Sequence, residues 1–330
     1  MARRSIGKPR FYADIPQYLK TLGYYDGSNS PEVWNMNPSQ PTEYESDEGF
    51  NVFEFIINKP SEDIDHLLTT IPQSDVSGLY AGVLGHDIKD KTVEVSLIQK
   101  EEGLEADLGY VIDFNEIKNY YNSPEYNGYS LWDITEWNNT PNNINTIRFA
   151  VEGEQVSIGC NSFGRWFEPE FSFDLKGTIA NNYEGVNVQN TVGGSTLSNI
   201  KHLGQPNWGN GLPAWAITDR IDEDYNLGGA KGRRSWQVGF SYLTDDKIFN
   251  KAGNPDKFFT YDEDTEQHTF DTSLGSFLKL TLNGKLPFIF CPDSSADDLE
   301  FALCRVTNQP SFSQVANNLF STSLTITETW

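Results

Sequence analysis

The stretch "RRSWQVGFSYLTDD", residues 233–246, carries the clearest strand pattern of the chain. Apolar or aromatic side chains occupy every second position, at Trp236, Val238, Phe240 and Tyr242. Successive side chains of a strand point to opposite faces, so this spacing is typical of a half-buried strand. We therefore expect these four side chains to face a core and the residues between them to face away from it.

Charged residues bracket this strand with opposite signs. Arg233 and Arg234 precede it, and Asp245 and Asp246 follow it. Guanidinium groups pair well with carboxylates, which leaves two interpretations of the arginines. They bridge to acids of their own chain, or they contact an acidic neighbouring subunit. The two aspartates suit the N-cap and first turn of a short helix.

The same alternation recurs along most of the chain and predicts its fold class. Turn-forming residues such as "NSPEYNG" (122–128) and "EWNNTPNN" (136–143) separate the alternating segments, which favours antiparallel strands joined by loops. We expect an all-β or β-dominated protein, with antiparallel β-sandwich-like sheets, long loops and two or three short helices. The expected strands lie at residues 50–57, 92–98, 109–114, 145–151, 155–160, 170–175, 185–194, 214–218, 235–243, 276–282, 286–290, 300–306 and 321–330.

Helix signals are few. Residues 14–23 combine a candidate N-cap at Asp14, a proline in the first turn and a stop at Gly23, which predicts one short helix. Residues 61–71 and 245–253 predict two more. Residues 28–49 hold three prolines and no sustained period, so they predict an extended loop.

The chain of 330 residues divides, by these patterns, into three regions. Residues 1–50 form a basic arm, a short helix and an extended loop. Residues 51–160 form a first β region and residues 161–330 a second, and these two can also constitute one continuous domain. "GQPNWGNGLPAWAI", residues 204–217, together with Trp236 predicts an aromatic core in the second region.

The charge balance argues against nucleic-acid partners. The formal net charge is -23, so the surface repels the phosphates of nucleic acids. The 21 Phe, 15 Tyr and 8 Trp separately indicate a packed chain. Against this background Arg3, Arg4, Lys8 and Arg10 stand in a segment without acids. Either they form a frayed basic tail, or they form an arm that lies on the acidic face of a neighbouring copy.

Neither the cysteines nor the N-terminal sequence indicates a metal site, a redox site or a targeting signal. Cys160, Cys291 and Cys304 lack the paired short spacing of a zinc or redox motif, so they are expected to be packing residues. We expect neither a standard signal peptide nor a membrane-spanning segment, because no long apolar run follows the basic start.

The search for catalytic groups finds no reaction centre. "GCNSFG" around Ser162 lacks the glycine that a nucleophile elbow needs two positions before the serine. No two of the 4 histidines have metal-ligand spacing. No phosphate-binding glycine loop is present, so we expect no nucleotide cofactor.

Two acidic clusters keep other interpretations open. They lie at residues 219–224 and 262–266, and they suit either solvated turns or calcium ligands. The same carboxylates would have to serve an acidic glycoside hydrolase. Tryptophan and tyrosine side chains on loops could also stack on sugar rings, although core burial explains them equally well.

The stretch "GRRSWQVGFSYLTDDKIF" (232–249) and the preceding "FSFDLKGTIANNYEGVNVQNTVGGSTLSNIKHLGQPNWGNGLPAWAI" (171–217) resemble virion structural proteins of tailed bacteriophages from marine and aquatic environments. The opening "IGKPRFYADIPQYLKTLG" (6–23) is similar to the start of such proteins. The resemblance implies a tail-associated assembly component and carries no catalytic motif.

These observations together predict a non-enzymatic component of a phage tail, baseplate or tail-to-capsid connection. It would assemble in multiple copies in the host cytoplasm, through sheet edges and the basic arm, with its own copies and neighbouring virion proteins as partners. Neither nucleic acid, membrane, metal nor cofactor is expected. The alternative is a protein at the tail tip that binds a host receptor or surface glycans. The cations expected at subunit contacts are Arg3, Arg4, Lys8, Arg10, Arg233 and Arg234.

Overall fold

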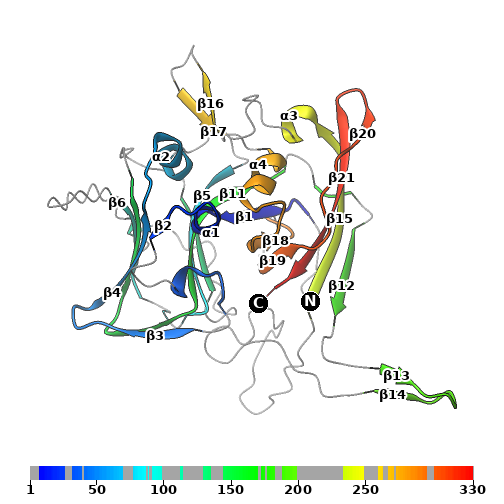
Figure 1. The fold of residues 1–330 in the computed structure, drawn as a ribbon, viewed down its shortest axis with the longest axis horizontal. Helices are drawn as coiled ribbons and strands as arrows, with labels where there is room; N and C mark the ends of the chain where they lie inside the picture. Colours follow the sequence, from blue (N-terminus) through cyan, green and yellow to red (C-terminus); the bar gives the residue numbers. More distant parts are fainter. Residues whose placement is uncertain are drawn as a thin grey trace.

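The fold was analysed in a computed structural model, shown in Figure 1. The structure describes the backbone of residues 7–26, 32–38, 41–69, 77–86, 88, 91–98, 112–113, 129–134, 144–169, 172–174, 177–182, 188–198, 233–248, 259–262, 267–270, 273–295 and 301–329.

A ten-stranded antiparallel sheet forms the main body of the molecule. Its strands follow the order β12-β15-β21-β19-β18-β1-β11-β5-β8, and β20 pairs with β21 beside this path. Their bounds are β1 Arg10–Asp14, β5 Ser77–Leu84, β8 Tyr129–Ile134, β11 Cys160–Phe167, β12 Thr178–Asn182, β15 Arg233–Thr244, β18 Phe288–Cys291, β19 Ala302–Val306, β20 Ser313–Ala316 and β21 Leu319–Glu328. The sheet takes strands from both sides of residue 160, so the two predicted β regions share it.

A five-stranded antiparallel sheet of order β2-β4-β9-β6-β7 lies beside the β5–β11 part of the large sheet (Figure 1). Its strands are β2 Tyr25–Asp26, β4 Phe50–Ile57, β6 Val93–Ile98, β7 Ile112–Asp113 and β9 Thr146–Glu152. Three two-stranded ladders complete the described strands: β3 Thr42–Glu45 with β10 Gln155–Ile158, β13 Val188–Asn190 with β14 Thr196–Ser198, and β16 Phe259–Asp262 with β17 Gln267–Phe270. The predicted β-dominated antiparallel class is confirmed.

Short helices lie between the strands. They are α1 Ile15–Thr21, η1 Glu32–Trp34, α2 Glu62–Thr69, α3 Asp245–Ile248 and α4 Leu274–Leu280. The start of α1 confirms its prediction in detail: Asp14 is the N-cap, its Oδ1 accepts from the Gln17 amide at 2.7 Å, and Gly23 follows the helix with φ +74. The predicted extended loop is wrong in part, because β3 and the buried Trp34 of η1 interrupt it.

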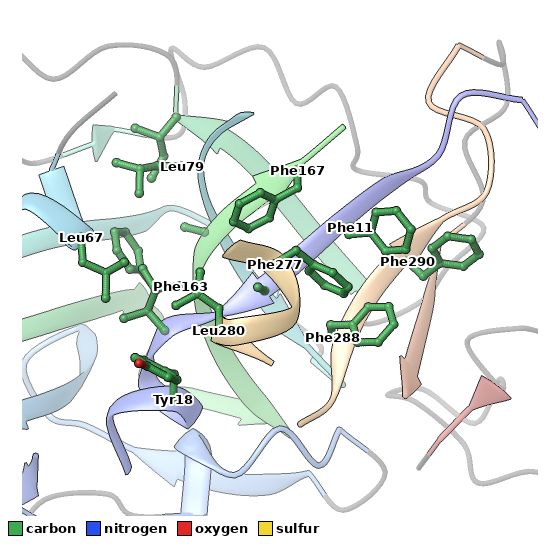
Figure 2. Close-up of a cluster of buried hydrophobic side chains, with 14 of the residues drawn as sticks. Phe11, Tyr18, Leu67, Leu79, Phe163, Phe167, Phe277, Leu280, Phe288 and Phe290 are labelled. Carbon is green, nitrogen blue, oxygen red and sulfur yellow. The ribbon is translucent and has the colours of Figure 1, made fainter. Parts of the chain in front are cut away.

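The core lies on both faces of β1. Phe11 faces α4, where its ring lies 4.8 Å from that of Phe277, and Phe288 packs on Phe277 at 5.0 Å (Figure 2). This side merges with the interior of the five-stranded sheet in one apolar cluster. Tyr12 points to the opposite face and contacts Tyr80 edge-on at 5.1 Å. Because β1 is covered on both faces, it lies at the centre of the packing.

The strand expected at residues 170–175 is wrong at the described residues 172–174, which form no regular secondary structure. Two further predictions fail for clear local reasons. Trp236, Val238 and Phe240 are buried as expected, but Tyr242 is 69% exposed. The pairing of β15 with β21 shifts between Phe240 and Leu243, and this bulge turns Leu243 inward in place of Tyr242. Residues 276–282, expected as a strand, mostly form α4, whose N-cap Ser273 accepts from the Ser276 amide. Short apolar runs are ambiguous between strand and helix, and the cap decides here.

Candidate interaction surface

The structure gives two of the N-terminal cations partners within their own chain. Arg10 at the start of β1 donates to Asp133 of β8 at 2.8 Å and to Glu168 at 3.0 Å. Its guanidinium also lies 4.1 Å from the Trp166 ring, and Lys8 pairs with Glu168 at 2.6 Å. Lys8 and Arg10 therefore fasten β1 to the β8–β11 part of the sheet, which contradicts a frayed tail at these two residues. Their predicted contact with a neighbouring subunit stays a prediction.

Glu168 is the acid that collects these contacts. Ser294 donates to the same carboxylate at 2.8 Å. Burial opposes ionisation of Glu168, but the hydrogen bonds from Lys8 and Ser294 and the charge of Arg10 outweigh it, so its pKa lies below the usual value. A carboxylate held this way is ionised at neutral pH. The cations Arg3 and Arg4 lie outside the described residues, so their predicted contacts stay predictions.

Arg234 also has an intrachain partner. Its Nε lies 2.5 Å from Oε1 of Glu328 on β21, and its Nη2 donates to the Phe301 carbonyl at 3.3 Å. Only 3% of Arg234 is exposed, so an acidic neighbouring subunit could not reach it. The intrachain interpretation thus describes Arg234, with Glu328 as the acid in place of the aspartates. Asp245 begins α3 at the far end of β15. Of Arg233 only the backbone is described, paired with Asn182.

Ser162, the serine of the rejected elbow motif, lies in the middle of β11 and is completely buried. Its hydroxyl donates to Asp14 Oδ2 at 2.8 Å and lies 2.8 Å from the Tyr80 hydroxyl. Burial raises the pKa of Asp14 to about 6, against hydrogen bonds from Gln17, Ser162 and Phe163 that lower it. β11 runs straight on through Ser162, so the sharp turn of a nucleophile elbow does not form. The cluster holds β1 in register.

A buried serine and histidine also meet, and their hydrogen bonds point the wrong way for catalysis. His86 Nε2 lies 2.8 Å from Ser130 Oγ, while its Nδ1 accepts from the Ile88 amide at 3.2 Å. Nδ1 therefore carries no proton, and in the neutral ring Nε2 is the protonated nitrogen that donates to Ser130. Burial lowers the pKa of His86 to about 3. The imidazole cannot accept the serine proton, so this pair is structural.

Within the described ranges no group of His, Cys, Asp and Glu could hold a metal ion. The acidic cluster at 219–224 and most of that at 262–266 lie outside those ranges. Cys160, Cys291 and Cys304 are buried thiols outside any disulfide, as expected of packing residues. None of the helices in the described part of the chain is long and apolar enough to span a membrane.

Two hairpins present exposed strands at opposite ends of the molecule. The β13–β14 hairpin extends away from the main body at the lower right of Figure 1, and the β20–β21 hairpin rises at the upper right. Residues 189–197 are exposed throughout, with Val192 at the turn and Leu197 on β14. All four residues of β20 are exposed as well, including Val315. These hairpins carry apolar side chains that their own chain does not cover.

Neither hairpin carries a charge. Residues 185–200 and residues 307–327 contain no Asp, Glu, Lys, Arg or His, in a chain of formal net charge -23. The end of β15 beside β21 is also uncharged over residues 235–244. Edge strands are usually protected by charged side chains or proline, and β14 and β20 have neither within their bounds. The uncharged runs are visible in the sequence, but they are less conspicuous there than the clustered cations.

Comparison with known proteins adds no relative. Neither a scan against family models, nor a search of curated proteins, nor a search of solved structures found a match for the chain.

Proposed function

We propose that this protein is a non-enzymatic building block of a tailed-phage particle, tail-associated, that works in multiple copies. One observation carries the proposal: two exposed, uncharged hairpins project from an otherwise acidic body. Strand edges of this kind, without charge or proline, readily add strands from other chains. The resemblance of residues 6–23, 171–217 and 232–249 to virion structural proteins gives the kind of assembly.

The polar clusters of the interior support a structural role. Asp14 with Ser162, and Arg234 with Glu328, are buried and join strands that are distant in the sequence. Each cluster satisfies its own hydrogen bonds across the sheet, and none of these clusters is accessible to a ligand. Their arrangement suits a rigid subunit that must keep its shape in an assembly.

Imaging and sedimentation of the purified protein test the proposal. We expect rings, tubes or stacks that form with rising concentration, together with no binding on a glycan array. A protein that stays monomeric and binds glycans would favour the receptor-binding alternative. That alternative relied on tryptophan and tyrosine side chains on loops. Of the tryptophans, Trp208 and Trp215 lie outside the described residues and Trp236 is buried.

A further inference from the structure

We infer that copies of this chain join head to tail, with the β13–β14 hairpin of one copy lying along β20 of the next. The inference rests on the proposed multi-copy function and names the contact that would produce it. It follows from where the two hairpins lie, from the free edges they present and from the charge of the rest of the chain.

Each hairpin presents a strand edge at one end of the molecule. Within the described strands, β14 pairs with β13 alone and β20 pairs with β21 alone, so each has one edge without a strand. The two hairpins lie at opposite ends of the side formed by β15 and β21 (Figure 1). A contact between two different surfaces at opposite ends repeats from copy to copy, and closes into a ring or continues as a filament.

Charge selects a second copy as the occupant. Two bodies of net charge -23 repel each other wherever their acidic surfaces approach. A contact between the hairpin of residues 188–198 and residues 307–327 brings together two runs without any charge, so it avoids that repulsion at close range. An unrelated basic partner would instead be drawn to the acidic surface and would have no reason to prefer uncharged strands.

The side chains of the hairpins suit the contact. Leu197 on β14 is 59% exposed and Val315 on β20 is 58% exposed. Tyr242, on the outer side of the β15 bulge, adds a third exposed apolar group at the β20 end. Backbone hydrogen bonds between the two edges would give the affinity, and burial of these side chains would fix the register.

Two single substitutions with matched exposure test the contact. Leu197→Glu places a charge on the β13–β14 hairpin, and Val315→Glu places a charge on β20. Each substitution therefore disrupts one side of the uncharged contact. Val52→Glu is the control, because Val52 is 48% exposed on β4 of the other sheet and the added charge is the same. In sedimentation velocity, we expect each hairpin variant to associate at least about tenfold more weakly than the wild type. The control should associate as the wild type does.

Mixing the two variants makes the test directional. A Leu197→Glu copy keeps its β20 edge and a Val315→Glu copy keeps its hairpin. At a concentration where each variant alone is mainly monomeric, the mixture should therefore form dimers and no longer assemblies. Hairpins that met each other symmetrically would leave the Val315→Glu protein assembling normally, which would overturn the inference. So would a mixture that stays monomeric, or a control that weakens as much as the variants.

Hydrogen exchange of the wild type gives a second measurement without substitutions. On assembly, the amides of residues 188–198 and 313–316 should gain protection, while those of residues 50–57 should not change. Assembly without this protection would contradict the head-to-tail contact but would remain consistent with the proposed multi-copy function. A wild-type protein that remains monomeric at every concentration would instead remove the proposed function, and the contact with it.

Discussion

Strand β11 at the centre of the large sheet and the β13–β14 hairpin outside it differ in how they carry polar groups. Every residue of β11 is buried, and two of its polar side chains have buried partners: Ser162 donates to Asp14 and Arg165 donates to the Leu67 carbonyl. The hairpin is exposed and polar without any charge. Buried polar groups fix one register, because each of them needs its own partner. Exposed uncharged strands lack such constraints and are free to take a partner from outside.

The largest expected effect concerns two glycines, one in each region. A Cβ on Gly164 of β11 would overlap the backbone carbonyl of Ala13 in β1, whereas a Cβ on Gly193 in the hairpin would meet nothing. Gly164→Ala should therefore lower the free energy of unfolding by about 4 kcal/mol or more, and Gly193→Ala should change it by less than about 0.5 kcal/mol. Urea unfolding measures both. Equal effects would remove the distinction between the regions.

Breaking the buried ion pair should have the next largest effect. Arg234→Met leaves Glu328 buried without its guanidinium and should cost about 3–5 kcal/mol of unfolding free energy. Arg305→Met on the adjacent β19 is the control, since Arg305 is exposed and should contribute about 1 kcal/mol or less. The double variant Arg234→Met, Glu328→Leu should recover much of the loss. If the double variant is as unstable as Arg234→Met, an unpaired charge is not the cause.

Asp14 should make the stability of the central strands depend on pH. Its pKa is raised from 3.8 to about 6 in the folded protein, so the folded state binds the proton more tightly than the unfolded state. Its contribution is present below pH 4 and is lost as the pH rises to about 6, a change of about 3 kcal/mol. His86, with its pKa lowered to about 3, has the opposite slope: its contribution is lost as the pH falls below 6.5.

Asp14→Asn isolates the first of these slopes. The difference in unfolding free energy between wild type and variant, measured by urea titration from pH 4 to pH 7, should shift in favour of the variant as the pH rises. His86 is the same in both proteins, so its slope cancels. A difference that stays constant over this range would contradict the ionisation of a buried Asp14.

The smallest expected effect separates the hairpins from the basic residues Arg3 and Arg4 as the source of assembly. Salt screens charge, so added NaCl should strengthen a contact between uncharged hairpins by a few-fold, because the acidic bodies repel less. The same salt would weaken a contact made by a basic arm. Deleting residues 1–6 tests the arm while leaving Lys8 and Arg10 in place, and sedimentation at low and high salt measures both effects.

How much of the fold the sequence predicts depends on the environment of each strand. β4 was predicted with its observed bounds, Phe50–Ile57, because its side chains alternate between the core and a more open face. β5 and β11 are covered on both faces, so their sequences, "SGLYAGVL" and "CNSFGRWF", show little alternation. β1 was missed because the helix signal of Asp14 and Pro16 begins where the strand ends.

The sequence shows some residues of the interaction surface but not how the fold arranges them. The cations stand out in the sequence, but Asp133, Glu168 and Glu328, the partners of Lys8, Arg10 and Arg234, lie far from them in the sequence and only the fold brings them together. Tyr242 was assigned to the core because a bulge leaves no trace in an alternating pattern. The absence of charge over residues 307–327 is visible in the sequence, but only the structure shows that β20 within this run is exposed.

The central position of β1 has a consequence for how the protein is made. β1 pairs on one side with β11 and on the other with β18, so residues 10–14 find their second neighbour only at residues 288–291. At about 5–20 residues per second, a ribosome takes roughly 15 to 60 seconds to synthesise the chain between them. Strand β1 must therefore wait for about 270 further residues before both of its neighbours exist, and we expect the large sheet to complete its folding late, at a rate set by long-range pairing.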